Sequence, residues 1–133
     1  MGTFFAWAGD TFELLSIQHL EQIQDALRIA SVDRNYSWRG LAPDGRTAQV
    51  DLVMESRASQ TDFLCEMKFA MGRFCVSQDD EADLMRRMSA FEASKMHHPS
   101  QSIQTVLVTT FGLARGEHAG VVQRVVTLEE LFG

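Results

Sequence analysis

Two neighbouring stretches of this 133-residue chain decide its predicted fold: AQVDLVME at residues 48–55 and DFLCEMKF at residues 62–69. Both are rich in β-branched, aromatic and aliphatic residues, and a polar stretch separates them, so together they predict a β-hairpin. Alternate side chains of a strand project from the same face. The expected groups are Gln49, Asp51, Val53 and Glu55 on the first strand, and Asp62, Leu64, Glu66 and Lys68 on the second.

The predicted hairpin brings two acids and one amine together. A turn centred near Ala58 and Ser59 places Asp51 opposite Glu66, with their Cβ atoms about 4.5–5.5 Å apart. Lys68 then lies one step along the same face. Carboxylates this close repel each other and raise the pKa of one of them, and a divalent cation offsets that repulsion. The alternative is a solvated polar face on which Lys68 forms a surface ion pair worth about 0–1 kcal/mol.

The residue types at this position indicate which ion the hairpin would hold. Two carboxylates, a backbone carbonyl (that of Met67) and water suit Mg²⁺ or Mn²⁺, whereas Zn²⁺ prefers His and Cys. His97 and His98 are adjacent and are not spaced as ligands. A bound ion can polarise a phosphodiester and lower the pKa of the attacking water, while Lys68 orients that water or stabilises charge on phosphorus. The predicted chemistry is metal-assisted phosphodiester hydrolysis.

The remaining patterns predict one α/β domain that spans residues 1–133, in the order α-β-β-β-α-β-β. Asp10 or Thr11 is expected to cap the first helix. The expected elements are a helix at 12–29, a strand at 35–40, a turn at 43–45, the hairpin, a helix at 78–96, strands at 103–110 and 121–126, and a short acidic end at 127–132.

Composition limits the classes of function. The net charge of −6 gives no global positive field, so any nucleic acid must be bound through local contacts. There is no targeting segment and no apolar run of membrane-spanning length, which predicts a cytoplasmic protein without membrane contact. Cys65 and Cys75 are expected to be reduced and structural. No phosphate-binding loop of ATPases occurs, so any ATPase part lies outside this chain.

A resemblance adds to these patterns. Asp51, fourteen intervening residues and the triplet Glu66-Met67-Lys68 resemble the PD-(D/E)XK nuclease motif. Further matching stretches follow in order along the whole chain. They are WAG at 7–9, FE at 12–13, QH at 18–19, QVDL at 49–52, LCEMKF at 64–69, TTFGL at 109–113 and VTLEELF at 126–132. Together they resemble the nuclease-like C-terminal domain of a group of bacterial and archaeal AAA-type ATPases.

The resemblance implies a restriction-endonuclease-like core, with a central mixed sheet of about four to five strands flanked by helices. It also implies that Glu13 completes the metal site, although Glu13 fits an exposed helix charge equally well. The family's second helix carries basic residues after a tyrosine. Here Asp80 occupies the tyrosine's place and Arg86-Arg87 supply the basic pair for phosphate, unless they form a solvated helix face.

Two functions follow from this reading. The first is a Mg²⁺- or Mn²⁺-dependent nuclease acting on DNA, with Asp51, Glu66 and Lys68 as catalytic residues. The second is a non-catalytic interaction module that keeps the nuclease fold and packs on an ATPase domain in cis or in trans. The chain would then be a fragment of a larger ATPase or a stand-alone relative. Exposed Phe4, Phe5 and Trp7 predict a homodimer.

Overall fold

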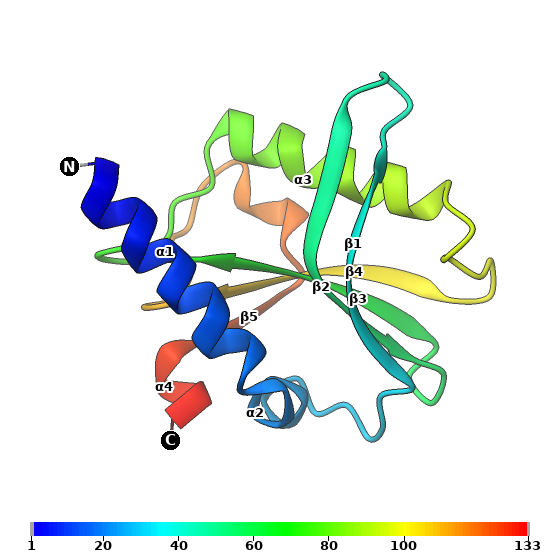
Figure 1. The fold of residues 1–133 in the computed structure, drawn as a ribbon, viewed down its shortest axis with the longest axis horizontal. Helices are drawn as coiled ribbons and strands as arrows, with labels where there is room; N and C mark the ends of the chain where they lie inside the picture. The colour runs from blue at the N-terminus through cyan, green and yellow to red at the C-terminus, as the bar shows by residue number, and fades with distance from the viewer. Residues whose placement is uncertain (1, 133) are drawn as a thin grey trace.

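The computed structural model describes residues 2–132, and the side chains from residue 9 onward. Its helices pack around one sheet (Figure 1). In chain order they are α1 (Gly2–Ile17), α2 (Leu20–Ala26), β1 (Arg34–Leu41), β2 (Thr47–Ser56), β3 (Thr61–Lys68), α3 (Gln78–Glu92), β4 (Ser102–Thr109), the 3-10 helix η1 (Ala119–Val121), β5 (Arg124–Thr127) and α4 (Leu128–Phe132). None of the described helices is long and apolar enough to cross a bilayer.

The sheet is mixed and open, with five strands in the order β1-β2-β3-β4-β5. β1, β2 and β3 form an antiparallel meander, whereas β4 pairs parallel to β3 and β5 parallel to β4. The α3 helix supplies the crossover from β3 to β4, as a parallel connection requires. The α/β class, the mixed sheet and the position of the hairpin in it agree with the sequence-based expectation.

Helices cover both faces of the sheet. Phe12 of α1, Ile23 of α2 and Leu131 of α4 pack on one face, against side chains that include Leu52 and Cys65. On the opposite face Phe91 of α3 packs with Val50, Val53 and Leu64. In Figure 1, α3 lies above the sheet, and α2 and α4 lie below it. Because helices cover both sides, burial is continuous over residues 52–56 of β2 and 61–67 of β3, polar side chains included.

The predicted single helix at residues 12–29 is wrong, because α1 begins at Gly2 and a break at Gln18 and His19 separates it from α2. Side chains cause the break. Ser16 Oγ donates to the Phe12 carbonyl at 2.8 Å, a contact that bends helices, and His19 Nδ1 bonds the Leu15 carbonyl at 2.6 Å. The expected cap at Asp10 or Thr11 therefore lies inside α1. The side chains of Phe4, Phe5 and Trp7, on which the homodimer prediction rests, lie outside the described ones.

Two further boundaries differ from the prediction. The α3 helix ends at Glu92 rather than residue 96, because Ser94 Oγ donates to the Phe91 carbonyl at 2.7 Å and closes the last turn. The last strand is shorter than residues 121–126, since η1 precedes it. The acidic end forms α4, whose first residues are capped by Thr127 and Glu130.

We expect Phe91→Ala to lower the free energy of unfolding by about 3–5 kcal/mol, because the Phe91 ring is fully buried and its loss leaves a cavity under α3. Urea denaturation followed by circular dichroism measures the change. Met85→Ala, on the same helix but 54% exposed, is the matched control and should shift the free energy by no more than about 0.5 kcal/mol. Similar losses in both variants would contradict this packing.

Candidate active site

The observed hairpin register supports the predicted encounter of Asp51 and Glu66. Leu52 pairs with Cys65 and Ser56 with Thr61, so the turn is centred between Ala58 and Ser59, as expected. The register ends at the Leu52–Cys65 pair, and Asp51 and Glu66, which come directly next on the two strands, interact with each other. The hairpin therefore brings the two acids together from strands that are adjacent in the sheet.

A β-bulge at Asp51 changes the faces predicted for β2. Tyr36 of β1 pairs with Val53, but Trp38 pairs with Val50, so β2 carries one residue more than β1 between these pairs. Val50 and Val53 consequently pack in the same cluster under α3. The expected shared face of Gln49, Asp51, Val53 and Glu55 is therefore wrong, because the extra residue interrupts the alternation.

At the bulge, the Asp51 side chain forms a hydrogen bond to the backbone of the neighbouring strand β3. Asp51 Oδ2 accepts a hydrogen bond from the Met67 backbone N–H at 3.0 Å, which ties the carboxylate to β3. The N–H and C=O of one strand residue point to the same neighbouring strand, so the Met67 carbonyl also faces β2. Asp51 is partly buried. Bulges often re-aim a side chain next to an active site.

Glu66 is the most unusual group in the hairpin, because it is an acid with only 3% of its surface exposed. One carboxylate oxygen, Oε2, accepts from Arg87 Nη1 of α3 at 2.7 Å. The other, Oε1, is buried without a hydrogen-bond partner among the described residues. The alternative prediction of a solvated polar face is therefore wrong for Glu66.

The electrostatics of Glu66 follow from this position. The pKa of Glu66 is raised to about 8, chiefly by burial and then by the neighbouring Asp51, while the Arg87 guanidinium and Lys68 lower it. At neutral pH Glu66 therefore holds a proton. The repulsion expected between facing carboxylates is relieved here by protonation and by Arg87.

Glu13 and Lys68 interact electrostatically with members of the Asp51–Glu66 pair. Glu13 lies on α1 and is partly buried. Burial, followed by the charges of Asp51 and Asp10, raises the pKa of Glu13, while Lys68 lowers it. The fold thus brings α1 to the hairpin end, where all four side chains named from the sequence interact electrostatically. Within residues 2–132, however, no three His, Cys, Asp or Glu side chains gather closely enough to hold a metal ion.

The two arginines of α3 do not form a solvated helix face. Arg87 pairs with Glu66, and Arg86 Nη1 pairs with Asp83 at 2.9 Å. Their side chains are only 22% and 16% exposed, respectively. Asp80, in the place of the family's tyrosine, has a structural role, since it forms a capping box with Ser77 at the start of α3.

Sequence reasoning assigned no role to the TTFGL stretch, but two of its residues hold the backbone that follows Glu66. Thr109 Oγ1 donates to the Lys68 carbonyl at 2.6 Å, and Thr110 Oγ1 accepts from the Ala70 N–H at 3.1 Å. Their position at the end of a predicted strand was the available sign. Gly112 has a φ of +100°, in the left-handed region that favours glycine. The expectation that both cysteines are structural holds for buried Cys65, whereas Cys75 is exposed.

Comparison of the chain with protein-family models, with curated proteins and with solved structures finds no match. Any function of this chain is therefore inferred from the geometry of its residues.

We predict that Glu66 makes the folded protein less stable as the pH rises. Between pH 4.5, where an ordinary Glu titrates, and about 8, the unfolded chain has released this proton while the folded chain still holds it. The free energy of unfolding should fall with a limiting slope of about 1.4 kcal/mol per pH unit. Urea denaturation across this window measures it. Glu66→Gln should flatten the profile and exposed Glu21→Gln should not; parallel profiles for wild type and Glu66→Gln would refute the assignment.

Proposed function

We propose that the chain is a divalent-metal-dependent nuclease domain of the PD-(D/E)XK type, which hydrolyses phosphodiester bonds of DNA. The observation that carries this proposal is the buried Glu66, which interacts with Asp51 of the adjacent strand and has one carboxylate oxygen without a hydrogen-bond partner among residues 9–132. A buried acid in this state needs a physical compensation. A bound cation supplies one.

The arrangement of elements supports the finer fold assignment, a restriction-endonuclease-like core. The helix, hairpin, helix and strand follow in the order that the resemblance implies, with Asp51 on β2 and the Glu66-Met67-Lys68 triplet on β3. The parallel β4 strand lies beside β3. The site is therefore at the end of the central strand of the sheet, between α1 and α3.

The donor atoms fit a hard divalent cation. The free Glu66 Oε1, the Asp51 carboxylate and the Met67 carbonyl are all oxygen donors, which Mg²⁺ and Mn²⁺ prefer. Glu13 is a further carboxylate, and its charge interacts with that of Asp51. When bound, the ion would supply Lewis-acid polarisation of the phosphodiester and a lowered pKa for water.

The chain's own residues have separate tasks in this proposal. Asp51 is oriented by its bond to the Met67 N–H, and Arg87 holds the Glu66 carboxylate from the helix side. Thr109 fixes the backbone of Lys68, and in this proposal the Lys68 ammonium orients the attacking water or stabilises charge on phosphorus. Arg86 and Arg87 are engaged by acids, so phosphate contact from α3 requires at least one of them to exchange partners.

A second function is favoured by one specific observation. Arg87 Nη1 donates to Glu66 Oε2 at 2.7 Å, and no three candidate ligands gather within the described residues. A protonated Glu66 held in this way is stable as a structural contact. The alternative proposal is therefore a non-catalytic module that keeps the nuclease fold and packs on an AAA-type ATPase domain.

If the domain is a nuclease, Asp51→Ala and Lys68→Ala should each reduce cleavage of DNA with Mg²⁺ or Mn²⁺ by about 10²-fold or more, since each removes a group that acts on the transition state. Gel assays on single- and double-stranded DNA measure the rates. Arg46→Ala, an exposed cation in the β1–β2 turn, serves as the control and should cut as wild type does. Wild-type rates in the Asp51→Ala protein would eliminate the nuclease proposal.

Metal binding should be linked to the proton held by the acid pair. We expect Mn²⁺ affinity to rise as the pH increases from 6 to 8, with about one proton released per ion at neutral pH, because the ion replaces the proton. Calorimetry in buffers of different ionisation enthalpy measures the proton count. Glu66→Gln should abolish binding, whereas Glu21→Gln should retain it. A wild-type protein that binds neither Mn²⁺ nor Mg²⁺ would favour the module instead.

A further inference from the structure

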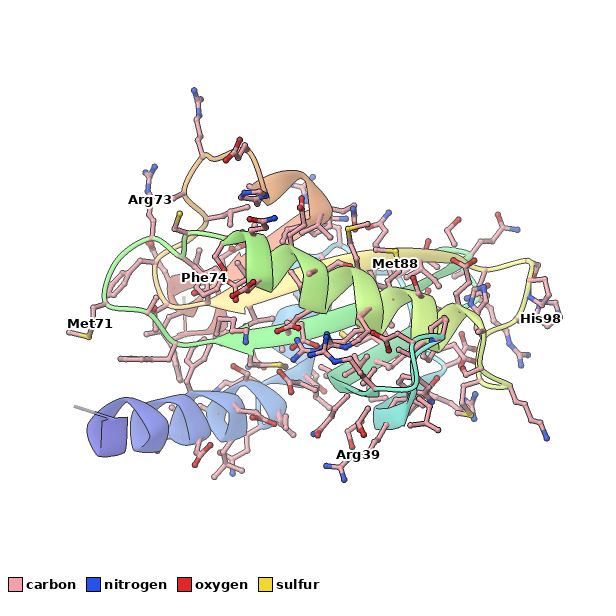
Figure 2. All side chains as sticks on the ribbon, turned by 90° about the horizontal axis from the view of Figure 1, so that it is seen from above. Arg39, Met71, Arg73, Phe74, Met88 and His98 are labelled. Atoms are coloured by element: carbon pink, nitrogen blue, oxygen red, sulfur yellow. The ribbon has the colours of Figure 1, made fainter. Side chains whose placement is uncertain are left out.

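A cleft of about 620 Å³ lies at the other end of β3 from Glu66. Its lining comes from the start of β1, the β2–β3 turn and the loop after α3, with Arg34, Arg57, Lys95 and His98 among its residues. His98 is at the opposite end of the molecule from the β3–α3 loop that carries Met71 and Arg73 (Figure 2). The cleft is therefore distinct from the candidate active site.

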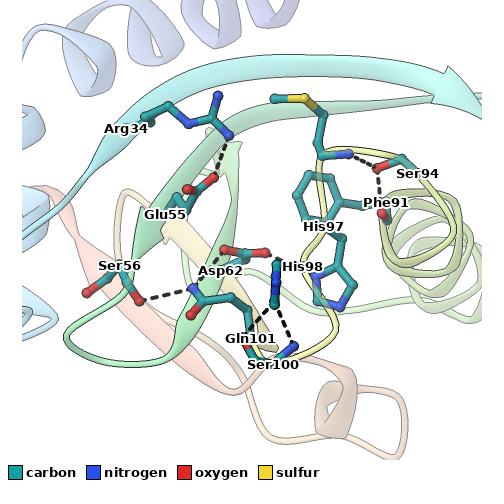
Figure 3. A network of polar contacts seen from close by, with 11 residues as sticks. Arg34, Glu55, Ser56, Asp62, Phe91, Ser94, His97, His98, Ser100 and Gln101 are labelled. Carbon is teal, nitrogen blue, oxygen red and sulfur yellow. Dashed lines mark hydrogen bonds and ion pairs between the residues drawn. The ribbon is translucent and has the colours of Figure 1, made fainter.

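The two acids in this cleft lie beneath its surface and are already paired. Asp62 is 1% exposed, and both its oxygens are bound, Oδ1 by Gln101 Nε2 at 3.2 Å and Oδ2 by His97 Nδ1 at 3.1 Å. Glu55 is 8% exposed and accepts from Arg34 at 2.8 Å. Figure 3 shows these contacts around Asp62. Neither carboxylate is therefore free to bind a cation from solution.

The accessible groups of the cleft are cationic. Arg57 and Lys95 are exposed, and neither side chain forms an ion pair with any carboxylate of the described residues. Arg34 keeps 54% of its side chain exposed despite its bond to Glu55. Three permanent cations, Arg34, Arg57 and Lys95, face two carboxylates, so the lining carries a formal charge of +1 in a chain of −6. The cleft is a local positive region of an acidic protein.

From this juxtaposition we propose that the cleft binds a phosphate group. The cations reach it from three separate segments, and a tetrahedral oxyanion accepts hydrogen bonds from several directions, whereas a planar carboxylate presents fewer. The Arg side chains suit bidentate contact and Lys95 a point contact. The buried Asp62–His97–Gln101 network holds the loop after α3 in place, and that loop carries Lys95 and His98. This site is independent of the proposed nuclease activity.

Calorimetric titration with inorganic phosphate, in the absence of divalent metal, tests the proposal. The wild-type protein should bind, and the double variant Arg57→Gln/Lys95→Gln should lose about tenfold or more in affinity, because two charge-assisted contacts are removed. The matched control is Arg39→Gln/Arg46→Gln, which removes the same charge from exposed arginines outside the cleft. Its affinity should stay within about twofold of wild type, since remote surface charges are screened.

A competition experiment then distinguishes the sources of the phosphate. An oligonucleotide with a 5′-phosphate that displaces inorganic phosphate better than its 5′-hydroxyl counterpart identifies a strand end. Equal displacement by both identifies the phosphodiester backbone, and displacement by neither identifies free phosphate or a small ester. All three support a phosphate site. No binding by the wild type, or equal affinity for wild type and Arg57→Gln/Lys95→Gln, overturns it whether or not the hairpin site cuts DNA.

Discussion

The burial of β3 on both faces is the constraint on which the rest of this structure depends. Every residue from Thr61 to Met67 is buried, because α1 and α2 cover one face and α3 covers the other. The strand also pairs on both edges, with β2 and β4. A polar side chain that β3 projects under α3 therefore has no access to bulk water. Its partners must come from within the protein, or from a ligand.

Two acids of β3, Asp62 and Glu66, meet this constraint differently. They project toward the same face, on either side of Leu64, and both are almost fully buried. Asp62 has a partner for each oxygen, so its charge is compensated by the protein alone. Glu66 has Arg87 for one oxygen and no hydrogen-bond partner among the described residues for the other, and Asp51 interacts with it. The incomplete pairing is the basis of the cation that we propose at the Glu66 end, whereas the complete pairing of Asp62 leaves the exposed arginines and Lys95 to set the charge of the other end.

Features encoded locally could be predicted from the sequence. The composition of the two strands on either side of a polar turn was sufficient to predict the hairpin and its register. Pro43-Asp44-Gly45 was sufficient to predict the chain reversal before it. The bulge at Asp51 and the break at His19 were missed because they depend on side-chain bonds and cross-strand registry that periodicity does not contain. The burial of Glu66 was missed for a different reason. An alternating strand has the same sequence pattern whether its polar face contacts solvent or α3. The pattern therefore could not predict that Arg87 packs against Glu66.

The contact between Arg87 and Glu66 separates the two functional readings in physical terms. As an ion pair it lets an acid remain in the core, and removal of one partner from a buried pair costs more than the pair contributes. As part of a metal site, it has to share the carboxylate with an ion that also displaces the proton of the Asp51–Glu66 pair. An interaction module needs only the first role. A nuclease needs both, so the enzyme proposal rests on Glu66 Oε1, which is buried without a hydrogen-bond partner among the described residues.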